Sequence, residues 1–196
     1  MKRLYIFILS VIVLTSTFIN VDARSFSDVA ENDWFYSTVS ELTDRRIVKG
    51  YDDGTFKPYK EVTYAEFFTL MTNATGHSQE PFTIVPRKWY LNTFNFLNHS
   101  GVPADEAKAD MPISRAEMAR FTSLILEKVV GYEFSAGSVS FTDEKDIDKD
   151  YLQYVKNLAA ANIITGDDSG NFLPDKSLNR AEASQVIKKI LELVRN

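Results

Sequence analysis

The sequence has 196 residues, of which 22 are lysine or arginine and 27 are aspartate or glutamate, so its formal net charge at pH 7 is -5. A mildly acidic chain presents no broad basic field, which argues against nucleic-acid binding, and any polyanion must be held by a few local cations. The chain contains no cysteine, and disulfides are therefore excluded. A hydrophobic content of 44% is enough for one sizeable core, so stability must come from packing.

The first 23 residues have the pattern of a secretory signal peptide. Lys2 and Arg3 precede an uncharged and mostly apolar run over 4–21, and Ala23 closes a site that a signal peptidase can cleave. An uncleaved membrane anchor is the alternative, since about eighteen residues could just span a bilayer. The serine and threonine residues inside the run favour cleavage. We therefore predict a signal peptide over 1–23 and a mature protein without membrane attachment.

The first predicted unit, residues 24–76, is a helix, a structured loop and a second helix. Asn32 or Asp33 can cap a helix that runs to about Arg46. An aspartate-glycine turn at 52–54 then reverses the chain. The second helix follows Thr63-Tyr64-Ala65-Glu66, a capping box in which threonine and glutamate satisfy two of the free backbone N–H groups at the helix start.

Two further units repeat this plan. The predicted segments are the linker 77–86, the middle unit 87–130, the linker 131–140 and the third unit 141–196, with helices near 89–98, 114–130, 151–161 and 179–194. The capping sequence recurs at 114–117 and 179–182, and apolar residues at helical spacing follow each copy. The middle unit is shorter between its helices, because the counterpart of the loop 50–58 is missing.

The first and third units align at a spacing of 116 residues. The aligned pairs include Val39 with Val155, Leu42 with Leu158, Gly50 with Gly166, Phe56 with Phe172 and Pro58 with Pro174. A unit of about 55 residues cannot bury its apolar face alone, so the units must share one core. We expect that core to contain Val39, Leu42, Phe94, Leu97, Val155 and Leu158.

Five spaced elements resemble the S-layer homology (SLH) module: Phe26-Ser27-Asp28-Val29, Trp34-Phe35-Tyr36, Ile47-Val48-Lys49-Gly50, Gly54-Thr55-Phe56-Lys57-Pro58 and Thr63-Tyr64-Ala65-Glu66. The resemblance is strong in the first and third units and partial in the middle one. It implies an all-α fold in which three helix-loop-helix SLH repeats, the middle one degenerate, pack into one pseudo-threefold body. It also implies a secreted cell-wall or cell-surface protein that binds an anionic, often pyruvylated, secondary cell wall polysaccharide non-covalently.

Arg115 and Arg180 are the leading candidates for ligand binding. Each follows its cap at the first helical position, where free backbone N–H groups and the helix dipole favour an anion. A cation there is unfavourable unless it has a partner, and a carboxylate or pyruvyl ketal would provide one through fork-like hydrogen bonds. The alternative is a solvated arginine paired with a nearby acid. In the ligand-binding role, replacing either arginine would hardly alter stability.

Tyr64 stands at this position in the first unit. A tyrosine can hydrogen-bond a sugar and stack on it, but it cannot neutralise a carboxylate. An arginine introduced at Tyr64 should therefore strengthen binding if the first pocket is otherwise intact.

The remaining candidates are paired between units: Trp34 with Trp89, Asp28 with Asp143, and Gly50 with Gly166. The tryptophans open the first helices of their units, where an indole could stack on a sugar or pack under the loop. The aspartates are expected to hydrogen-bond loop backbone in preference to a ligand. The glycines are primarily turn residues, and the resemblance adds a secondary role in letting loop N–H groups approach the ligand.

Nothing in the sequence indicates an enzyme. Asp146, Asp148 and Asp150 resemble a calcium loop, but Tyr151 and Asn157 stand where that loop needs glycine and glutamate, so a solvated acidic turn is preferred. No nucleophile motif, phosphate loop or metal-ligand cluster is present, and we expect no cofactor.

A second function class stays open beside polysaccharide binding. The units could keep their fold but lose carbohydrate affinity, and then serve as a structural or interaction module for other cell-surface or S-layer proteins. The shortened middle unit and Tyr64 favour this alternative.

Overall fold

The computed structural model describes residues 26–78, 88–135, 137 and 139–195, so the predicted signal peptide and most of the linker 77–86 lie outside the described residues. Within those ranges the helices are α1 (Tyr36–Asp44), α2 (Tyr64–Ala74), α3 (Leu91–His99), α4 (Arg115–Ile125), α5 (Lys149–Ala160) and α6 (Arg180–Val194). Short turns of helix at η2 (Glu106–Lys108), η3 (Leu126–Val130) and η4 (Glu144–Asp146) complete them. The all-α prediction is confirmed. Among these described elements, none is long and apolar enough to cross a membrane.

The three capping sequences each begin a helix. The side chains of Thr63, Ser114 and Asn179 accept hydrogen bonds from the backbone N–H of the glutamate three residues later. The reciprocal bond from the cap N–H to the glutamate is present at Thr63 and Asn179. At Ser114 the predicted box is only half formed, because the Glu117 carboxylate accepts instead from Ser114 Oγ and from Lys108 Nζ.

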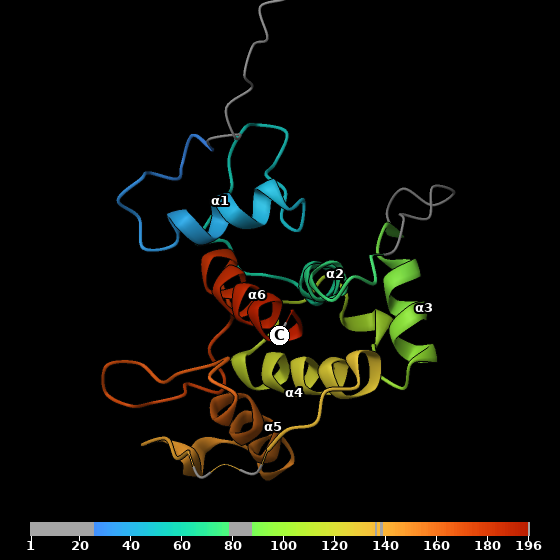
Figure 1. Ribbon diagram of the computed structural model, residues 1–196, viewed down its shortest axis with the longest axis vertical. Coiled ribbons are helices and arrows are strands. Elements are labelled where there is room, and N and C mark those ends of the chain that lie inside the picture. The colour runs from blue at the N-terminus through green and yellow to red at the C-terminus, as the bar shows by residue number, and fades with distance from the viewer. Residues whose placement is uncertain (1–25, 79–87, 136, 138, 196) are drawn as a thin grey trace, which may run out of the picture.

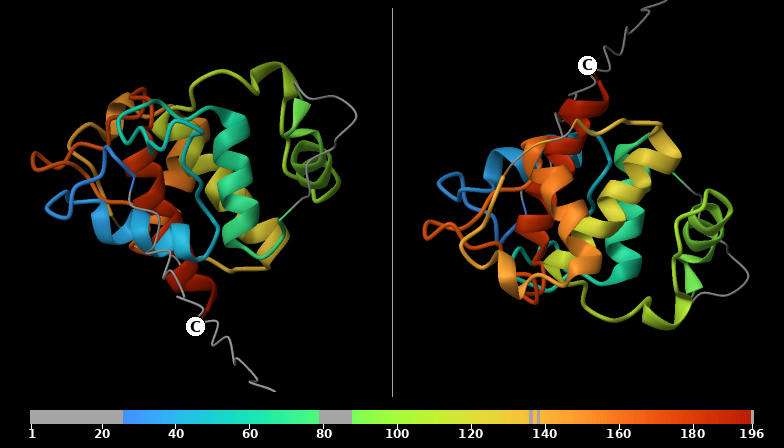
Figure 2. Two further views of the ribbon diagram at one scale, coloured as in Figure 1. Left: turned by 90° about the horizontal axis from the view of Figure 1, so that it is seen from above. Right: turned by 90° about the horizontal axis from the view of Figure 1, so that it is seen from below.

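The helices that follow the capping sequences, α2, α4 and α6, lie at the centre, and α1, α3 and α5 lie around them (Figure 1). α2 packs against both α4 and α6. Each outer helix packs against the central helix of the preceding unit, since α3 lies on α2 and α5 lies on α4, while α1 lies on α6. The packing pairs therefore cross the unit boundaries drawn from the sequence, and the pair α6 with α1 closes the ring. Figure 2 shows α3 at the opposite side of the body from α1.

A ring of three backbone hydrogen bonds marks the pseudo-threefold axis. Val62 N donates to Leu178 O over 2.8 Å, Leu178 N to Ile113 O over 3.1 Å, and Ile113 N to Val62 O over 3.0 Å. All three side chains are fully buried. Each residue immediately precedes a cap, so the ring fixes the starts of α2, α4 and α6 relative to one another.

One hydrophobic core runs through the whole described body. The six residues expected to form it, Val39, Leu42, Phe94, Leu97, Val155 and Leu158, are each at most 2% exposed. The prediction of a shared core is confirmed, and the helices form a single body because no pair of them buries its apolar surface alone.

Candidate ligand-binding site

Arg180 reaches from the start of α6 into the loop of the first unit. Its Nε donates to Phe56 O and its Nη2 to Lys49 O, both over 2.8 Å. The guanidinium carbon lies 4.6 Å from the centroid of the Phe56 ring and 5.0 Å from that of Tyr51. Arg180 is only 8% exposed. The side chain therefore joins the third unit to the first, and its charged group is buried.

Arg115 makes the corresponding contact between the middle and third units. Its Nε donates to Phe172 O over 2.6 Å and its Nη2 to Thr165 O over 3.3 Å. Phe172 and Thr165 are the repeat equivalents of Phe56 and Lys49, so both arginines occupy the same structural position. Burial lowers the pKa of Arg115, and the charges of Glu182, Asp143 and Asp167 oppose that shift.

The sequence offered two partners for these arginines, a ligand or a local acid, and the structure shows a third. Both guanidiniums donate to backbone carbonyls of a neighbouring unit, and neither pairs with a carboxylate of the described residues. The ligand role of Arg115 and Arg180 stays a prediction, now alongside a structural role. A guanidinium has five donors, so two carbonyl bonds leave capacity for an anion.

The expected free N–H groups at the helix starts are occupied, which corrects that part of the argument. In α6, Arg180 N donates to Lys60 O and Ala181 N to Pro58 O. The first two N–H groups of α2 and α4 likewise donate to carbonyls of a neighbouring unit. The loops satisfy the donors that would otherwise face a ligand. An anion at these positions must therefore be held by side chains.

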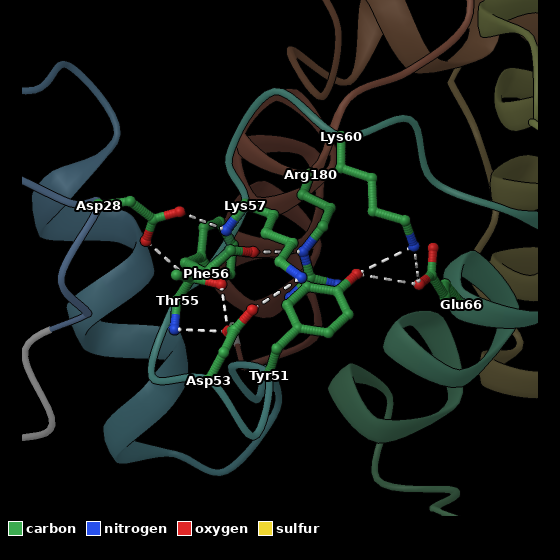
Figure 3. A network of polar contacts seen from close by, with 9 residues as sticks. All are labelled: Asp28, Tyr51, Asp53, Thr55, Phe56, Lys57, Lys60, Glu66 and Arg180. Carbon is green, nitrogen blue, oxygen red and sulfur yellow. Dashed lines mark hydrogen bonds and ion pairs between the residues drawn. The ribbon is translucent and has the colours of Figure 1, made fainter.

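A cluster of cations surrounds Tyr51 where α6 meets the first loop, as Figure 3 shows. We call Tyr51, Lys57, Lys60 and Arg180 the Tyr51 cluster. Lys57 Nζ lies 4.2 Å and Lys60 Nζ 5.3 Å from the centroid of the Tyr51 ring, and Lys60 Nζ donates to the Tyr51 hydroxyl over 3.0 Å. The lysine side chains are 41% and 43% exposed. Solvent therefore reaches two ammonium groups that share the Tyr51 ring with a buried guanidinium.

Both lysines of the cluster already have surface partners. Lys57 Nζ lies 3.0 Å from Asp53 Oδ2, and Lys60 Nζ lies 2.9 Å from Glu66 Oε1. Hydrogen bonds from Thr55 and Lys57 lower the pKa of Asp53 to about 2. Exposed pairs of this kind contribute about 0–1 kcal/mol, so a ligand carboxylate can replace them at little cost.

Asp28 and Asp143 hold the loops, as predicted. The two oxygens of Asp28 accept from Phe56 N and Lys57 N over 2.7 and 2.8 Å. Asp143 accepts from Phe172 N and Leu173 N, both over 2.7 Å. Lys57 has a φ of 56°, in the left-handed region that side chains disfavour, and the aspartate bonds stabilise it there.

Gly50 and Gly166 are required by packing within the same loops. A Cβ on Gly50 would lie 2.2 Å from Phe26 Cε1, and one on Gly166 would lie 3.0 Å from Gly170 C. The approach at Gly50 leaves no room for a side chain, and at Gly166 a side chain would require the loop backbone to shift. These contacts account for both glycines within the loops, and a secondary part in ligand approach stays a prediction.

Tyr64 lies in the interior. The residue is 2% exposed, and its ring packs edge-on against Phe68 and Phe121. Burial and a hydrogen bond with Glu117 raise the pKa of Tyr64 above its ordinary value. The ring fills the place that an arginine takes at the other two interfaces, and no sugar can reach its face.

Trp34 and Trp89 lie on the surface, with 57% and 40% of their area exposed. Trp34 contacts the buried Phe35 edge-on, and Trp89 contacts the buried Tyr90 in the same way. The neighbouring aromatic residue therefore packs inward in each unit, and the indole stays accessible to a ligand. Sugar stacking remains a prediction for both.

Sequence reasoning missed Tyr51, Lys57 and Lys60. The signal was two lysines on either side of Pro58 in a loop with an upstream tyrosine, but such residues are common on solvated surfaces. Only the closure of α6 onto this loop brings Arg180 to them.

Comparison with known proteins finds matches in the first and third units of the chain. Residues 25–68 and 140–184 match the S-layer homology (SLH) domain. The two matches correspond to the first and third units, which carry the Tyr51 cluster and its repeat equivalent. SLH domains are binding and anchoring modules that bind cell wall polysaccharide.

Three relatives illustrate where such segments occur. The chain is 30% identical to Exoglucanase XynX of Acetivibrio thermocellus over 88% of its own length and 17% of the relative. It is 30% identical to a cellulosome-anchoring protein of the same species over 74% of its length and 35% of the relative. It is 25% identical to an S-layer protein of Bacillus thuringiensis subsp. finitimus over 85% and 21%.

The chain thus spans between 17% and 35% of the length of these relatives. In the exoglucanase the shared segment is a side module. The SLH matches and the S-layer and anchoring relatives show a secreted protein of the cell wall or cell surface.

Proposed function

We propose that this protein anchors non-covalently at the cell surface by binding an anionic secondary cell wall polysaccharide, through carboxylate substituents such as pyruvyl ketals. It uses three SLH units, of which the middle one is degenerate. The function is binding, without catalysis. The observation that supports the proposal best is the Tyr51 cluster, where three cations and a phenol meet between two units matched by the SLH domain.

The cluster has the chemistry that a carboxylated sugar requires. Arg180 supplies a fixed positive charge, because it is buried and donates to two backbone carbonyls, with no ion pair to a carboxylate among the described residues. Lys57 and Lys60 exchange their exposed pairs for a ligand carboxylate. The Tyr51 hydroxyl donates to or accepts from sugar hydroxyls. A few local cations thus hold a polyanion on a chain with a net charge of -5.

Two features favour the second candidate, a structural or protein-interaction module at the cell surface. Tyr64 is buried and closes the interface between the first and middle units, so no cation of the arginine type is present there. The middle unit also lacks the long loop. Other cell-surface or S-layer proteins would then be the partners.

Binding to purified wall sacculi, before and after extraction of the secondary polymer, tests the proposal. We expect the protein to sediment with intact sacculi and to stay in solution after extraction. Lys57→Ala with Lys60→Ala should weaken binding about ten- to hundredfold, because two charge-assisted contacts are lost. Lys189→Ala is the matched control, since this exposed lysine of α6 pairs with Glu192, outside the Tyr51 cluster, and its variant should bind as the parent does.

Equal binding to intact and extracted sacculi would eliminate polysaccharide recognition. Equal binding by the double lysine variant and the parent would show that the Tyr51 cluster is not the polysaccharide-binding site. The first of these results would move the protein-interaction role ahead.

A further inference from the structure

We propose that the three pseudo-equivalent interfaces are not equivalent sites, and that the chain holds a single carboxylate site, at the Tyr51 cluster. The contact around Arg115 has the same backbone but rejects anions, and Tyr51 and Lys57 are the residues that determine the difference. This inference rests on the proposed function and specifies which interface carries it.

The backbone of the two interfaces is the same in detail. Arg180 and Arg115 donate through Nε and Nη2 to equivalent carbonyls. Lys57 and its counterpart Leu173 both have a left-handed φ, of 56° and 60°. Asp28 and its counterpart Asp143 hold both loops in the same way, as described above. Any difference in ligand binding must therefore come from the side chains that face each arginine.

The first difference is at Tyr51, whose counterpart is Asp167. Asp167 accepts through Oδ1 from the backbone N–H groups of Ser169 and Asn171, over 2.9 and 2.8 Å. These bonds and the charge of Arg115 lower the pKa of Asp167, so the carboxylate stays ionised. A fixed negative charge thus stands where the first interface has a neutral phenol. Its charge interacts favourably with that of Arg115 and repels a carboxylated ligand.

The second difference is at Lys57, whose counterpart is Leu173. Leu173 is 39% exposed and adds no charge. It lines an open groove of about 670 Å³ with Asp143, Asp146, Asn171, Asp175 and Lys176. Lys176 pairs with Glu182 as its counterpart Lys60 pairs with Glu66, so this cation is common to both interfaces and the ammonium that the third-unit loop lacks is the one at Lys57. The third-unit loop therefore has an apolar side chain where the first loop has an exposed ammonium, and the groove beside it is lined by three carboxylates.

Reciprocal exchange of two residues tests the inference. Tyr51→Asp with Lys57→Leu gives the first loop the side chains of the second, and Asp167→Tyr with Leu173→Lys does the reverse. The lysine placed at Leu173 has the same left-handed backbone as Lys57, so the exchange is matched. The probe is a methyl hexopyranoside with a 4,6-linked pyruvyl ketal, and its control is the 4,6-ethylidene acetal, which lacks the carboxylate. Backbone amide chemical shifts, measured by NMR during titration with the probe, show binding at each loop separately.

In the parent, we expect the ketal to shift amides around Tyr51 and Lys57, and to leave those around Asp167 and Leu173 unchanged. The acetal should shift neither loop. Tyr51→Asp with Lys57→Leu should weaken the affinity for the probe at least about tenfold. Asp167→Tyr with Leu173→Lys should add a binding site at the third-unit loop. Lys57→Leu alone provides the same test of the first loop if the double variant is unstable.

Shifts at both loops of the parent would overturn the inference, as would shifts at the third-unit loop alone or at neither loop at millimolar probe. A second exchange that adds no site would also overturn it. Sedimentation with sacculi is independent of these outcomes, so the single-site inference can fail while wall binding stands.

Discussion

Arg180 and Phe56 are 124 residues apart in the chain, yet Arg180 Nε donates to the Phe56 carbonyl. The same guanidinium bonds Lys49 O and lies over the Phe56 ring. The residue with the strongest sequence signature for a ligand is therefore also a link between the third unit and the first. Its two roles can be separated, because one acts on stability and the other on affinity.

Arg180→Ala should destabilise the protein by about 3 kcal/mol, since two hydrogen bonds from a charged group are lost and two carbonyls lose their donor. The sequence predicted almost no change. Arg180→Lys should be intermediate, because a point charge cannot reach both carbonyls. Urea denaturation measures the difference. Arg45→Ala is the control, since this exposed arginine pairs with Glu41 one turn away and should change stability by less than about 0.5 kcal/mol. An Arg180→Ala midpoint equal to the parent's would show that the loop contact is absent in solution.

The caps can be tested without any ligand. Ser114→Ala and Asn179→Ala should each lower the free energy of unfolding by about 1 kcal/mol, because one backbone N–H at the start of α4 or α6 loses its acceptor. Thermal denaturation followed by circular dichroism measures the loss. If neither variant melts earlier than the parent, the capping bonds contribute nothing and the common helix start needs another cause.

The variant Tyr64→Arg distinguishes the buried position of Tyr64 in the structure from the binding role that the sequence pattern suggested. The sequence suggested that an arginine here would improve binding if the pocket were intact, but the ring is buried against Phe68 and Phe121. A charge placed there should cost about 3 kcal/mol and create no site. Tyr64→Phe should cost only about 1 kcal/mol, for the lost bond to Glu117. Denaturation and sacculi binding would be measured together, and a stable Tyr64→Arg variant with stronger binding would contradict the interior placement.

The third unit should not fold by itself. A fragment of residues 141–196 lacks α4, against which α5 packs, and α1, against which α6 packs. Its apolar faces at Val155, Leu158 and Ile187 would be open to water. We expect a rapidly digested fragment without a cooperative thermal transition. A protease-resistant fragment with its own transition would show three independent units.

The starts of α2, α4 and α6 could be predicted because their capping signals are local, but the cap predicted at Asn32 or Asp33 is wrong, since α1 begins at Tyr36 and its N-cap Phe35 makes no side-chain capping bond. Thr63 and Glu66 are three residues apart, and a capping bond depends on nothing else. The core residues followed from helical spacing, which shows which face of a helix is apolar. Spacing does not show which neighbour covers that face, so the packing of α1 on α6 could not be read from the chain. The Tyr51 cluster was missed for the same reason, since it exists only after that closure.

The closure of α1 on α6 also sets an order of events in the folding of the chain. Thr38 Oγ1 on α1 donates to Gln185 Oε1 on α6 across 147 residues. Val39 and Leu42 of α1 therefore stay uncovered until α6 has formed. Arg180 arrives in the same step, and with it the complete Tyr51 cluster. A chain that has not yet closed in this way therefore lacks the complete cluster, even where its first loop is already formed.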